Sequence, residues 1–371
     1  MAAKRLRSDS ISPPRLKRTR QGDGSSPVPH ALTIYSWNIN GVGPFLQPAI
    51  SSFFPNPNDK QSPSGINANL RDVLRKYAWP TMLLLQEVKI HPQDMATQRA
   101  IEKAVMPRAK TLPDEPAYKV HFCLPRDKFN ARGFGRKIYG VCTIIREDYY
   151  DECVERVRDC EWDGEGRVLI CETRAVGKVP KLAIINLYAV NGTERPYRDS
   201  ETGQIIGTRH DRKLQVHMLL QAECRELEAD GFRVILAGDM NIARTPLDGY
   251  PSLREHPRQH CINRADFEAR FFGTGRSAED SSKSEVDHGL GMIDSFRHLY
   301  PRRTGYTHYP RISGKAFGSS CDRVDMILVS RQLKMYLTEA GMHETAADRS
   351  SSDHVPLFAT LSFERDPNGA P

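Results

Sequence analysis

Short β-rich runs that alternate with helical patterns constrain the fold of this chain more than any other feature. The runs are rich in β-branched and aromatic residues and are bounded by polar segments, which is typical of strands. The predicted strands are Leu32–Asn38, Thr81–Val88, Tyr139–Arg146, Val168–Val176, Lys181–Val190, Arg233–Asp239, Arg323–Ser330 and Val355–Phe363. Three stretches with a helical repeat of apolar residues lie between them: Ile66–Tyr77, Ala96–Val105 and Arg212–Ala229. This mixture predicts an α/β or α+β fold, and the length of 371 residues leaves open whether it forms one large domain or two.

The sequence indicates neither a membrane span nor a disulfide framework. No apolar run approaches the roughly 18 residues that a membrane-spanning helix needs, and the charged N-terminus has no hydrophobic segment behind it. We therefore expect neither secretion nor contact with a membrane. The eight cysteines are scattered without a C-x-x-C pair, and several lie in apolar runs. They are interpreted as reduced core residues rather than as disulfides or zinc ligands.

Basic residues are concentrated at the N-terminus. The first 20 residues hold seven of the 53 Lys and Arg residues but only one of the 46 Asp and Glu residues, so most of the net charge of +7 lies there. Residues 1–30 contain little apolar material and are predicted to be a disordered tail. Two clusters, Lys4–Arg7 and Arg15–Arg20, are typical of a bipartite nuclear localisation signal, which predicts a nuclear protein recognised by the import machinery. The alternative is a solubilising arm that binds polyanions.

Carboxylates and amides stand at the ends of the apolar strands. Such groups are costly inside or beside an apolar strand unless they are paired, hydrogen-bonded or bound to a metal. Five segments from distant parts of the chain share this feature, and together they predict one convergent site. They are Trp37–Gly41, Leu85–Lys89, Gly238–Asn241, Arg323–Asp325 and Ser352–His354.

Three of these side chains have the chemistry of magnesium ligands. Glu87 and Asp353 offer hard carboxylate oxygens of the kind that Mg²⁺ prefers, and Asn40 offers an amide oxygen that completes the set. Water would fill the remaining octahedral positions.

Four further side chains are suited to handle a proton and an oxyanion. Asp239 could accept a proton from an attacking water that Asn241 holds, and Asp325 could orient the imidazole of His354. None of the five segments supplies a Ser or Cys nucleophile, so phosphodiester hydrolysis fits better than acyl transfer. Each motif alone is weak, because a Glu after an apolar strand is more often structural. Only the combination is specific.

Seven short motifs run through residues 31–363. They are Trp-Asn-Ile-Asn-Gly at 37–41, Leu-Gln-Glu-Val-Lys at 85–89, Asn-Leu-Tyr at 186–188, Gly-Asp-Met-Asn-Ile-Ala at 238–243, Asp-Ser-Phe-Arg-His-Leu-Tyr-Pro at 294–301, Arg-Val-Asp at 323–325 and Ser-Asp-His-Val-Pro at 352–356. In this order they resemble the exonuclease III branch of the endonuclease/exonuclease/phosphatase superfamily, which contains apurinic/apyrimidinic (AP) endonucleases. The segment 294–301 favours this branch over the lipid phosphatases and sphingomyelinases of the superfamily. The resemblance implies one catalytic domain, residues 31–365, folded as a four-layer sandwich of two mixed β-sheets flanked by helices, like deoxyribonuclease I.

The resemblance also implies a role for each site residue. It makes Glu87 the principal Mg²⁺ ligand, with Mn²⁺ as a substitute ion, and it places Asn40 and Asp353 in the metal region. The implied catalytic residues are Tyr188, Asp239, Asn241, Asp325 and His354, and the implied bracing or phosphate-contacting residues are Asn38, Lys89 and Asn191. In-line attack of water on phosphorus would leave a 3′-hydroxyl and a 5′-phosphate. Tyr188 could instead be a core tyrosine, because it ends an apolar run.

The resemblance is weakest at the pocket for the abasic sugar. The family usually has one aromatic residue after a Tyr-Thr pair and another before the Arg-x-Asp motif, whereas this chain has His308, Tyr309 and Asp322 around these positions. The run Arg136–Val141 is altered as well. We expect incision 5′ to abasic sites, with 3′-to-5′ exonuclease or 3′-phosphodiesterase activity. The alternatives are a nuclease that acts mainly at 3′ ends, an enzyme for RNA or small phosphoesters, and a catalytically silent DNA-binding scaffold.

Several polar segments are candidates for contact with the substrate or solvent. Possible DNA-binding residues are Arg195, Arg209, Arg212 and Arg323, and the segment Arg264–Arg270 is a further candidate. The expected partner is double-stranded DNA with abasic sites or damaged 3′ ends, bound by a monomer. Pro55–Ser64 and Gly273–Gly291 are predicted to be mobile surface loops.

Overall fold

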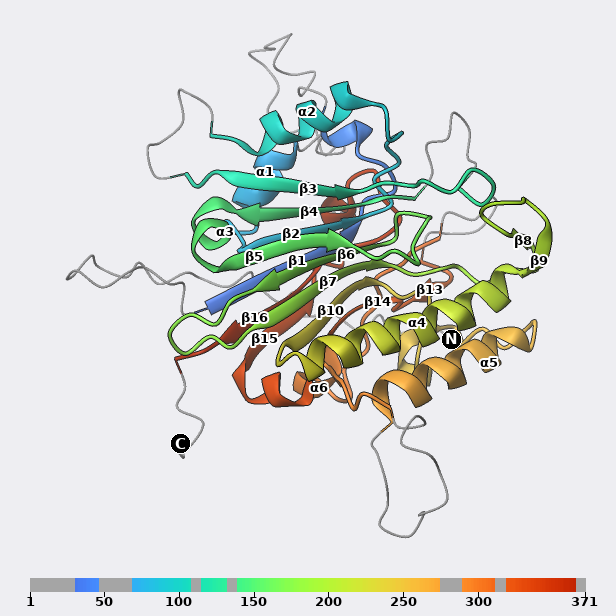
Figure 1. Ribbon diagram of the computed structural model, residues 1–371. Helices are drawn as coiled ribbons and strands as arrows, with labels where there is room; N and C mark the ends of the chain where they lie inside the picture. Colours follow the sequence, from blue (N-terminus) through green and yellow to red (C-terminus); the bar gives the residue numbers. More distant parts are fainter. Residues whose placement is uncertain are drawn as a thin grey trace, which may run out of the picture.

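Two β-sheets pack face to face, and helices cover the outer face of each (Figure 1). The computed structural model describes residues 31–46, 69–107, 115–131, 139–273, 289–310 and 318–364. Within these ranges the layers follow the order helix, sheet, sheet, helix. This arrangement confirms the predicted four-layer sandwich.

Each large sheet contains six strands and mixes parallel with antiparallel neighbours. The first sheet has the order β15 (Leu337–Met342), β16 (Leu357–Ser362), β1 (Ala31–Asn38), β2 (Met82–Gln86), β4 (Val141–Arg146), β3 (Tyr118–Cys123). The second has the order β12 (Ile293–Asp294), β14 (Asp325–Val329), β10 (Arg233–Asp239), β7 (Leu182–Tyr188), β6 (Val168–Thr173), β5 (Val154–Asp159). Two small ribbons pair β8 (Pro196–Arg198) with β9 (Ile205–Thr208) and β11 (Gly249–Tyr250) with β13 (Cys321–Asp322).

The main helices lie on the outer faces of the two sheets (Figure 1). Helices α1 (Leu70–Lys76) and α2 (Met95–Val105) cover the first sheet, and α4 (Arg209–Ala229) and α5 (Gln259–Phe267) cover the second. The shorter elements are α3 (Glu147–Cys153), α6 (Ser295–Leu299), α7 (Ala346–Arg349), the 3-10 turns Gly43–Phe45, Pro246–Asp248 and Arg331–Tyr336, and the π-helical turn Glu268–Phe272.

The predicted strands and helices are present within a few residues of their expected bounds. Helix α4 begins at Arg209, three residues before its predicted start, because the side chains of Thr208 and Asp211 form a capping box there. The sequence pattern does not predict β3, β5 or β15. All three lie at sheet edges, where a strand needs less apolar surface than one enclosed on both sides.

Alternate residues of the central strands pack on opposite faces of each sheet. Leu84 of β2 and Ile184 of β7 belong to the core between the sheets, whereas Leu85 packs beneath α1 and α2 and Ile185 packs beneath α4. The cysteines confirm their interpretation as core residues, because all eight are free and only Cys261 is partly exposed.

Polar side chains replace apolar ones at one end of the interface between the two sheets. The alternation that places Ile235 and Ala237 between the sheets also places Asp239 there, and in the same way it brings Asn186 and Tyr188 into the interface. The strands β1 and β2 are parallel, as are β7 and β10, so their carboxyl ends lie at the same edge of the sandwich.

A fully buried amide joins the two sheets. Asn186 of β7 accepts a hydrogen bond of 2.8 Å from Gln86 Nε2 of β2, and its own Nδ2 donates to Cys142 O and Thr143 Oγ1 of β4 at 3.0 and 3.2 Å. These are directional contacts inside an apolar interface, so they specify how one sheet lies over the other.

Replacing Asn186 with Leu should destabilise the protein by roughly 1–3 kcal/mol, because buried polar groups on the facing sheet lose their partner. Urea unfolding measures this change. Ile184→Val, on the same face of the same strand, is the control and should cost only about 0.5–1.5 kcal/mol. Unchanged stability of the Leu variant would show that the amide contacts are not needed to join the sheets.

Three arginines predicted to contact DNA are buried in ion pairs instead. Arg323 is 1% exposed and pairs with Asp248 at 2.7 Å and with Asp294 at 2.6 Å. Arg209 forms two hydrogen bonds with Glu165, and Arg212 lies 3.8 Å from the same carboxylate. This is a correction of the prediction: the guanidinium groups face inward, because together with Arg167, Arg244 and Arg297 they neutralise the buried carboxylates of Glu165, Asp248 and Asp294.

Arg323→Met should cost about 3 kcal/mol at neutral pH, because the variant leaves buried carboxylates without their main partner. The arginines, outweighing burial, lower the pKa of Asp248 to about 2, so its stabilising effect is present above its unfolded pKa and is lost as the pH falls toward 2. The stability difference from the wild type should therefore shrink below about pH 4. Normal stability combined with weaker DNA binding would restore the original interpretation of Arg323 as a phosphate contact.

Some predictions fall outside the described residues. These are the tail at 1–30 with both basic clusters, the loop at 55–64, positions 274–288 of the second loop, and Arg136–Ile138 of the altered run. In the part of the chain that the structure describes, no helix is both long and apolar enough to cross a membrane.

Candidate active site

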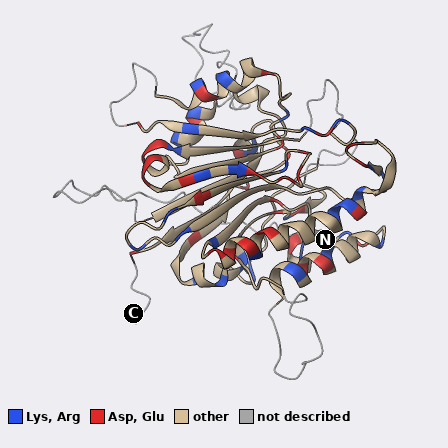
Figure 2. Cartoon of the chain, viewed as in Figure 1, with Lys and Arg blue, Asp and Glu red and all other residues tan. Residues whose placement is uncertain are grey.

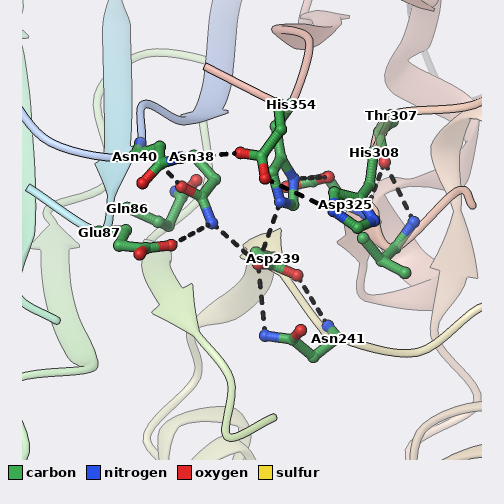
Figure 3. A network of polar contacts seen from close by, with 12 residues as sticks. Asn38, Asn40, Gln86, Glu87, Asp239, Asn241, Thr307, His308, Asp325 and His354 are labelled. Carbon is green, nitrogen blue, oxygen red and sulfur yellow. Dashed lines mark hydrogen bonds and ion pairs between the residues drawn. The ribbon is translucent and has the colours of Figure 1, made fainter. Parts of the chain in front are cut away.

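The polar strand ends surround a cavity of about 340 Å³ at one edge of the sandwich (Figure 3). Among the residues that line it are Asn38, Asn40, Glu87, Tyr188, Asn191, Asp239, Asn241, Asp353 and His354, all of which the sequence predicted. Asp325 lies directly behind His354, and Lys89 contacts Glu87 and Asn40. The structure therefore brings the predicted catalytic, metal and bracing residues into one place.

Strand register explains how residues so far apart in sequence meet. Asp239 at the end of β10 is paired with Tyr188 at the end of parallel β7 and with Asp325 at the start of antiparallel β14. In the first sheet, Asn38 at the end of β1 is paired with Gln86 at the end of parallel β2. Antiparallel β16 begins beside the end of β1, which brings the preceding His354 to the same edge.

Four site residues have left-handed backbone conformations. Asn40, Glu87, Lys89 and Asn241 have φ between +51° and +56°, a region that is uncommon for residues other than glycine. At Glu87 this conformation interrupts the strand alternation immediately after Gln86 and turns the carboxylate toward the cavity. The backbone is held there by the hydrogen bond from Lys89 N to Tyr139 O at 2.9 Å. Such strained conformations persist where the surrounding contacts enforce them, and they are concentrated in functional sites.

Asn38 joins the two carboxylates at the centre of the site (Figure 3). Its buried Nδ2 donates to Glu87 Oε2 at 3.1 Å and to Asp239 Oδ2 at 3.0 Å. The hydroxyl of Tyr188 donates to the same Glu87 oxygen at 2.9 Å. These contacts fix the orientation of both carboxylates while leaving Glu87 Oε1 directed elsewhere.

The residues predicted as metal ligands fit a cation. Lys89 Nζ lies 2.9 Å from Glu87 Oε1 and also donates to Asn40 Oδ1, so a positive charge already bridges these two oxygens. Asp353 joins the group through a hydrogen bond of 3.1 Å from Asn40 Nδ2. Two carboxylates and an amide oxygen are hard donors of the type that Mg²⁺ and related divalent ions take.

A second acidic group lies deeper in the site. Single ligand atoms of Asp239, Asp325 and His354 lie within 4.8 Å of one another, which is close enough to hold a metal ion. Asp325 Oδ1 is buried without a hydrogen-bond partner, while its other oxygen bonds His354 Nδ1 at 2.8 Å. The site therefore offers two possible positions for a divalent ion. One lies among Glu87, Asp353 and Asn40, and the other lies among Asp239, Asp325 and His354.

Burial and neighbouring charges change the proton affinity of Asp239 and His354. Burial, with the charge of Asp325, raises the pKa of Asp239 to about 6. Burial alone would lower the pKa of His354, but the charge and hydrogen bond of Asp325 outweigh it and raise that pKa to about 10. At neutral pH the site thus holds an ionised Asp239 whose oxygen lies 4.0 Å from the Nε2 of an imidazolium. A base and an oxyanion-binding group face each other.

Asn241 is positioned to work with Asp239. Its main-chain N–H donates to Asp239 Oδ1 at 2.8 Å, and its Nδ2 donates to Ala189 O at 3.0 Å and lies 3.3 Å from Asp239 Oδ2. The amide and the carboxylate therefore present adjacent polar atoms to the cavity, as holding and deprotonating one water molecule requires.

Two of the three altered pocket positions line the cavity. The ring of His308 lies 4.6 Å from that of His354, and its Nε2 lies 3.7 Å from Asp353 Oδ2. Asp322 pairs with His308 through two main-chain hydrogen bonds and also lines the cavity. Tyr309 instead packs against the core between the sheets. The polar character expected of this pocket is therefore supplied by His308 and Asp322.

Four polar residues of the cavity wall were not predicted from the sequence. They are Lys213, Arg254, His260 and Asn263. Arg264 also lines the cavity and belongs to a segment predicted to contact DNA. A signal for Lys213 was available, because it has the spacing of the buried residues Val216, Leu220, Cys224 and Leu227 along α4. A charged residue at a buried helical position indicates a specific partner.

Comparisons with known proteins identify relatives that match most of the chain. The model of the Endonuclease/Exonuclease/phosphatase family matches residues 35–354. The chain is 26% identical over 346 residues to mouse DNA-(apurinic or apyrimidinic site) endonuclease 2, covering 89% of this chain and 60% of that protein. The human protein of the same name is 28% identical over 351 residues, covering 91% and 61%. The chain thus spans about three fifths of the length of these relatives.

Solved structures support the fold. The catalytic domain of Xenopus laevis APE2 superposes with a TM-score of 0.57 at 19% identity, covering 89% of this chain and 92% of that one. At this identity the likeness establishes the arrangement of sheets and helices.

The opposite electrostatic surroundings of two histidines can be measured directly. In metal-free protein His354 should stay protonated up to about pH 10, and Asp325→Asn should lower its pKa because burial then dominates. His217 is the internal control, since burial lowers its pKa to about 4 and it should be neutral at pH 7. Titration of the ring nitrogens by NMR distinguishes these states. Equal titration of His354 in the wild type and the variant would contradict the proposed pairing.

Proposed function

The chain belongs to the endonuclease/exonuclease/phosphatase family, and we propose that it is a divalent-metal-dependent DNA phosphodiesterase that incises DNA 5′ to abasic sites. One observation carries the proposal: Asp239 lies between the amide of Asn38, which also holds Glu87, and the imidazolium of His354. The site therefore combines a base, a cation-binding carboxylate and an oxyanion-binding group around one cavity.

The residues of the chain divide the reaction between them. Asp239 accepts a proton from a water molecule that Asn241 orients, and the water oxygen attacks phosphorus in line with the departing 3′ oxygen. The phosphorus–oxygen bond to that atom breaks and the 3′ oxygen takes a proton from solvent, which leaves a 3′-hydroxyl and a 5′-phosphate. His354 donates a hydrogen bond to a non-bridging oxygen, where negative charge increases in the transition state. Asp325 keeps His354 protonated for this role.

Glu87, Asp353 and Asn40 are the proposed ligands of a Mg²⁺ ion, with Mn²⁺ as a substitute. When bound, the ion supplies Lewis-acid stabilisation of the phosphate and the leaving oxygen. Tyr188 and Asn38 orient Glu87 for binding, and Lys89 balances the charge of the group. Asn191 lies at the cavity wall, where it can contact the phosphate.

The polar pocket favours a second candidate substrate. A flipped abasic sugar is a small group that an apolar pocket holds well, whereas His308 and Asp322 offer hydrogen bonds and charge at this place. A 3′ terminus with a hydroxyl or a blocking group suits such a wall better. We therefore include 3′-to-5′ exonuclease or 3′-phosphodiesterase activity in the proposal, as an additional or main activity.

Double-stranded DNA with abasic sites or damaged 3′ ends is the proposed partner, bound by a monomer. After the correction of Arg209, Arg212 and Arg323, the candidates for phosphate contacts are the exposed Arg195 and Arg254 and the partly exposed Arg264. Figure 2 shows that Lys, Arg, Asp and Glu are interspersed along α4 and α5, so contacts on that side would depend on individual arginines. The basic tail supports a nuclear location and recognition by the import machinery.

A 5′-labelled duplex with one tetrahydrofuran abasic analogue tests the proposal. Wild-type protein with Mg²⁺ should cut 5′ to the analogue, and Glu87→Ala should lose at least about a hundredfold in rate because the cation loses its main ligand. Glu226→Ala, at an exposed position of α4, is the matched control and should keep wild-type activity.

The same assay separates the alternatives when it includes an intact duplex and a recessed 3′ end. Degradation only from 3′ ends would keep the mechanism and transfer the function to the second candidate. Activity on RNA or small phosphodiesters alone would reject the DNA assignment. No hydrolysis of any of these substrates, together with retained DNA binding, would indicate a silent scaffold.

A further inference from the structure

A lysine is buried without a carboxylate partner behind the site. Lys213 of α4 is 1% exposed, and in the part of the chain that the structure describes no carboxylate lies within the 4.0 Å of an ion pair with it. The neighbouring buried cations differ: Arg167 and Arg209 both pair with Glu165. Burying an ammonium without a paired carboxylate is costly: burial lowers the pKa of Lys213, and the more distant charge of Asp239 opposes this shift without cancelling it.

The partners of Lys213 are three main-chain carbonyl groups, one of which belongs to the cavity-lining Asn241. Its Nζ donates to Val190 O at 2.7 Å, to Met240 O at 3.1 Å and to Asn241 O at 3.2 Å. Val190 immediately precedes Asn191, so the ammonium contacts the two polypeptide segments that carry the cavity-lining Asn191 and Asn241. One segment follows β7 and the other follows β10.

These two segments have few other contacts with each other. Asn241 Nδ2 donates to Ala189 O at 3.0 Å, and Ala189 N donates to Asp239 O at 2.8 Å. Both bonds involve Ala189, the first residue after β7, whereas Lys213 binds the carbonyl groups of the next residues, Val190, Met240 and Asn241. Lys213 thus adds polar contacts between α4 and the left-handed turn at Asn241, beside the apolar packing of Met240 and Ile242 in the same core as α4.

A purely stabilising role does not explain why a lysine is placed here. Replacing a buried charge with a well-packed apolar side chain is often neutral or stabilising, and the surrounding residues of α4 already pack in an apolar core. An apolar residue, in contrast, has no N–H donors and could not bind the three carbonyl groups. Lys213 therefore fixes the positions of the carbonyl groups that it contacts, at a cost to the stability of the fold.

We propose that Lys213 is a positioning residue that fixes Asn241 and Asn191 relative to Asp239 by holding the carbonyl groups of both segments. This inference rests on the proposed function, because it concerns how that function's water-orienting and phosphate-contacting side chains are held. Lys213 acts through these residues and does not itself contact the reacting atoms.

Lys213→Met tests the proposal, because it keeps the length of the side chain and removes the three donors. With the abasic duplex and Mg²⁺, kcat should fall about tenfold or more while KM changes less than about twofold, since the exact placement of Asn241 and Asn191 matters more for the transition state than for binding of the duplex. The melting temperature should not fall. The control is Leu220→Ala, which creates a packing defect two turns further along the same buried face of α4. It should lower the melting temperature while keeping kcat.

Hydrogen exchange measured by mass spectrometry gives a readout that is independent of activity. Residues 189–193 and 239–243 should exchange faster in Lys213→Met than in Leu220→Ala, and Lys213→Arg should restore part of both the protection and kcat. Unchanged kcat and exchange in Lys213→Met, or a kcat loss that merely follows a lower melting temperature, would overturn the proposal.

The two proposals fail separately in this design. If wild-type protein hydrolyses none of the DNA substrates, the proposed function is wrong, and the exchange comparison still decides whether Lys213 holds the two segments. If wild-type protein is active and the exchange of both segments is unchanged by Lys213→Met, the function stands and the positioning role is rejected.

Discussion

The hydrogen bond between Gln86 and Asn186 is the contact on which the geometry of the site depends. Apolar side chains hold the sheets together, but they attract without direction and would tolerate small shifts of one sheet over the other. The buried amides remove this freedom. Glu87 follows Gln86 directly, and Tyr188 lies two residues beyond Asn186 on the same face of β7. The amide contact therefore sets the distance across which the tyrosine hydroxyl reaches the carboxylate.

Charge is distributed differently in the site and beneath it. Beneath the site, Arg167 and Arg209 neutralise Glu165, and Arg323 neutralises Asp248 and Asp294. In these groups every buried carboxylate is paired with an arginine. At the cavity itself the carboxylates outnumber the cations that contact them. Lys89 and His354 compensate only part of this excess. The remaining negative charge is what a divalent ion would neutralise. Burial, followed by the charge of Asp325, explains why the pKa of Asp239 is higher than that of an exposed aspartate.

The sequence allowed the site to be predicted because its residues obey strand alternation. Asp239 and Asp325 stand at inner-face positions of strands that were recognisable from their apolar residues, and convergence follows once these strands pair. The partners of buried charged residues could not be predicted in the same way. Arg323 and Lys213 look alike in sequence, as cations near polar motifs, yet one is neutralised by two carboxylates and the other contacts only carbonyl groups. These partners come from distant segments, and no local pattern identifies them. The edge strands were missed for a related reason, because their exposed faces carry polar residues.

The alternation of side chains also makes the length of each strand part of the active site. Insertion of one residue within β10 upstream of Asp239 would move its carboxylate from the face between the sheets to the face beneath α4, although every residue would still be present. The same holds for β1 and Asn38. Insertions and deletions are consequently compatible with the site only in the connections between strands, and an engineer who wishes to alter substrate preference has far more freedom in those connections than in the short strands that end at the cavity.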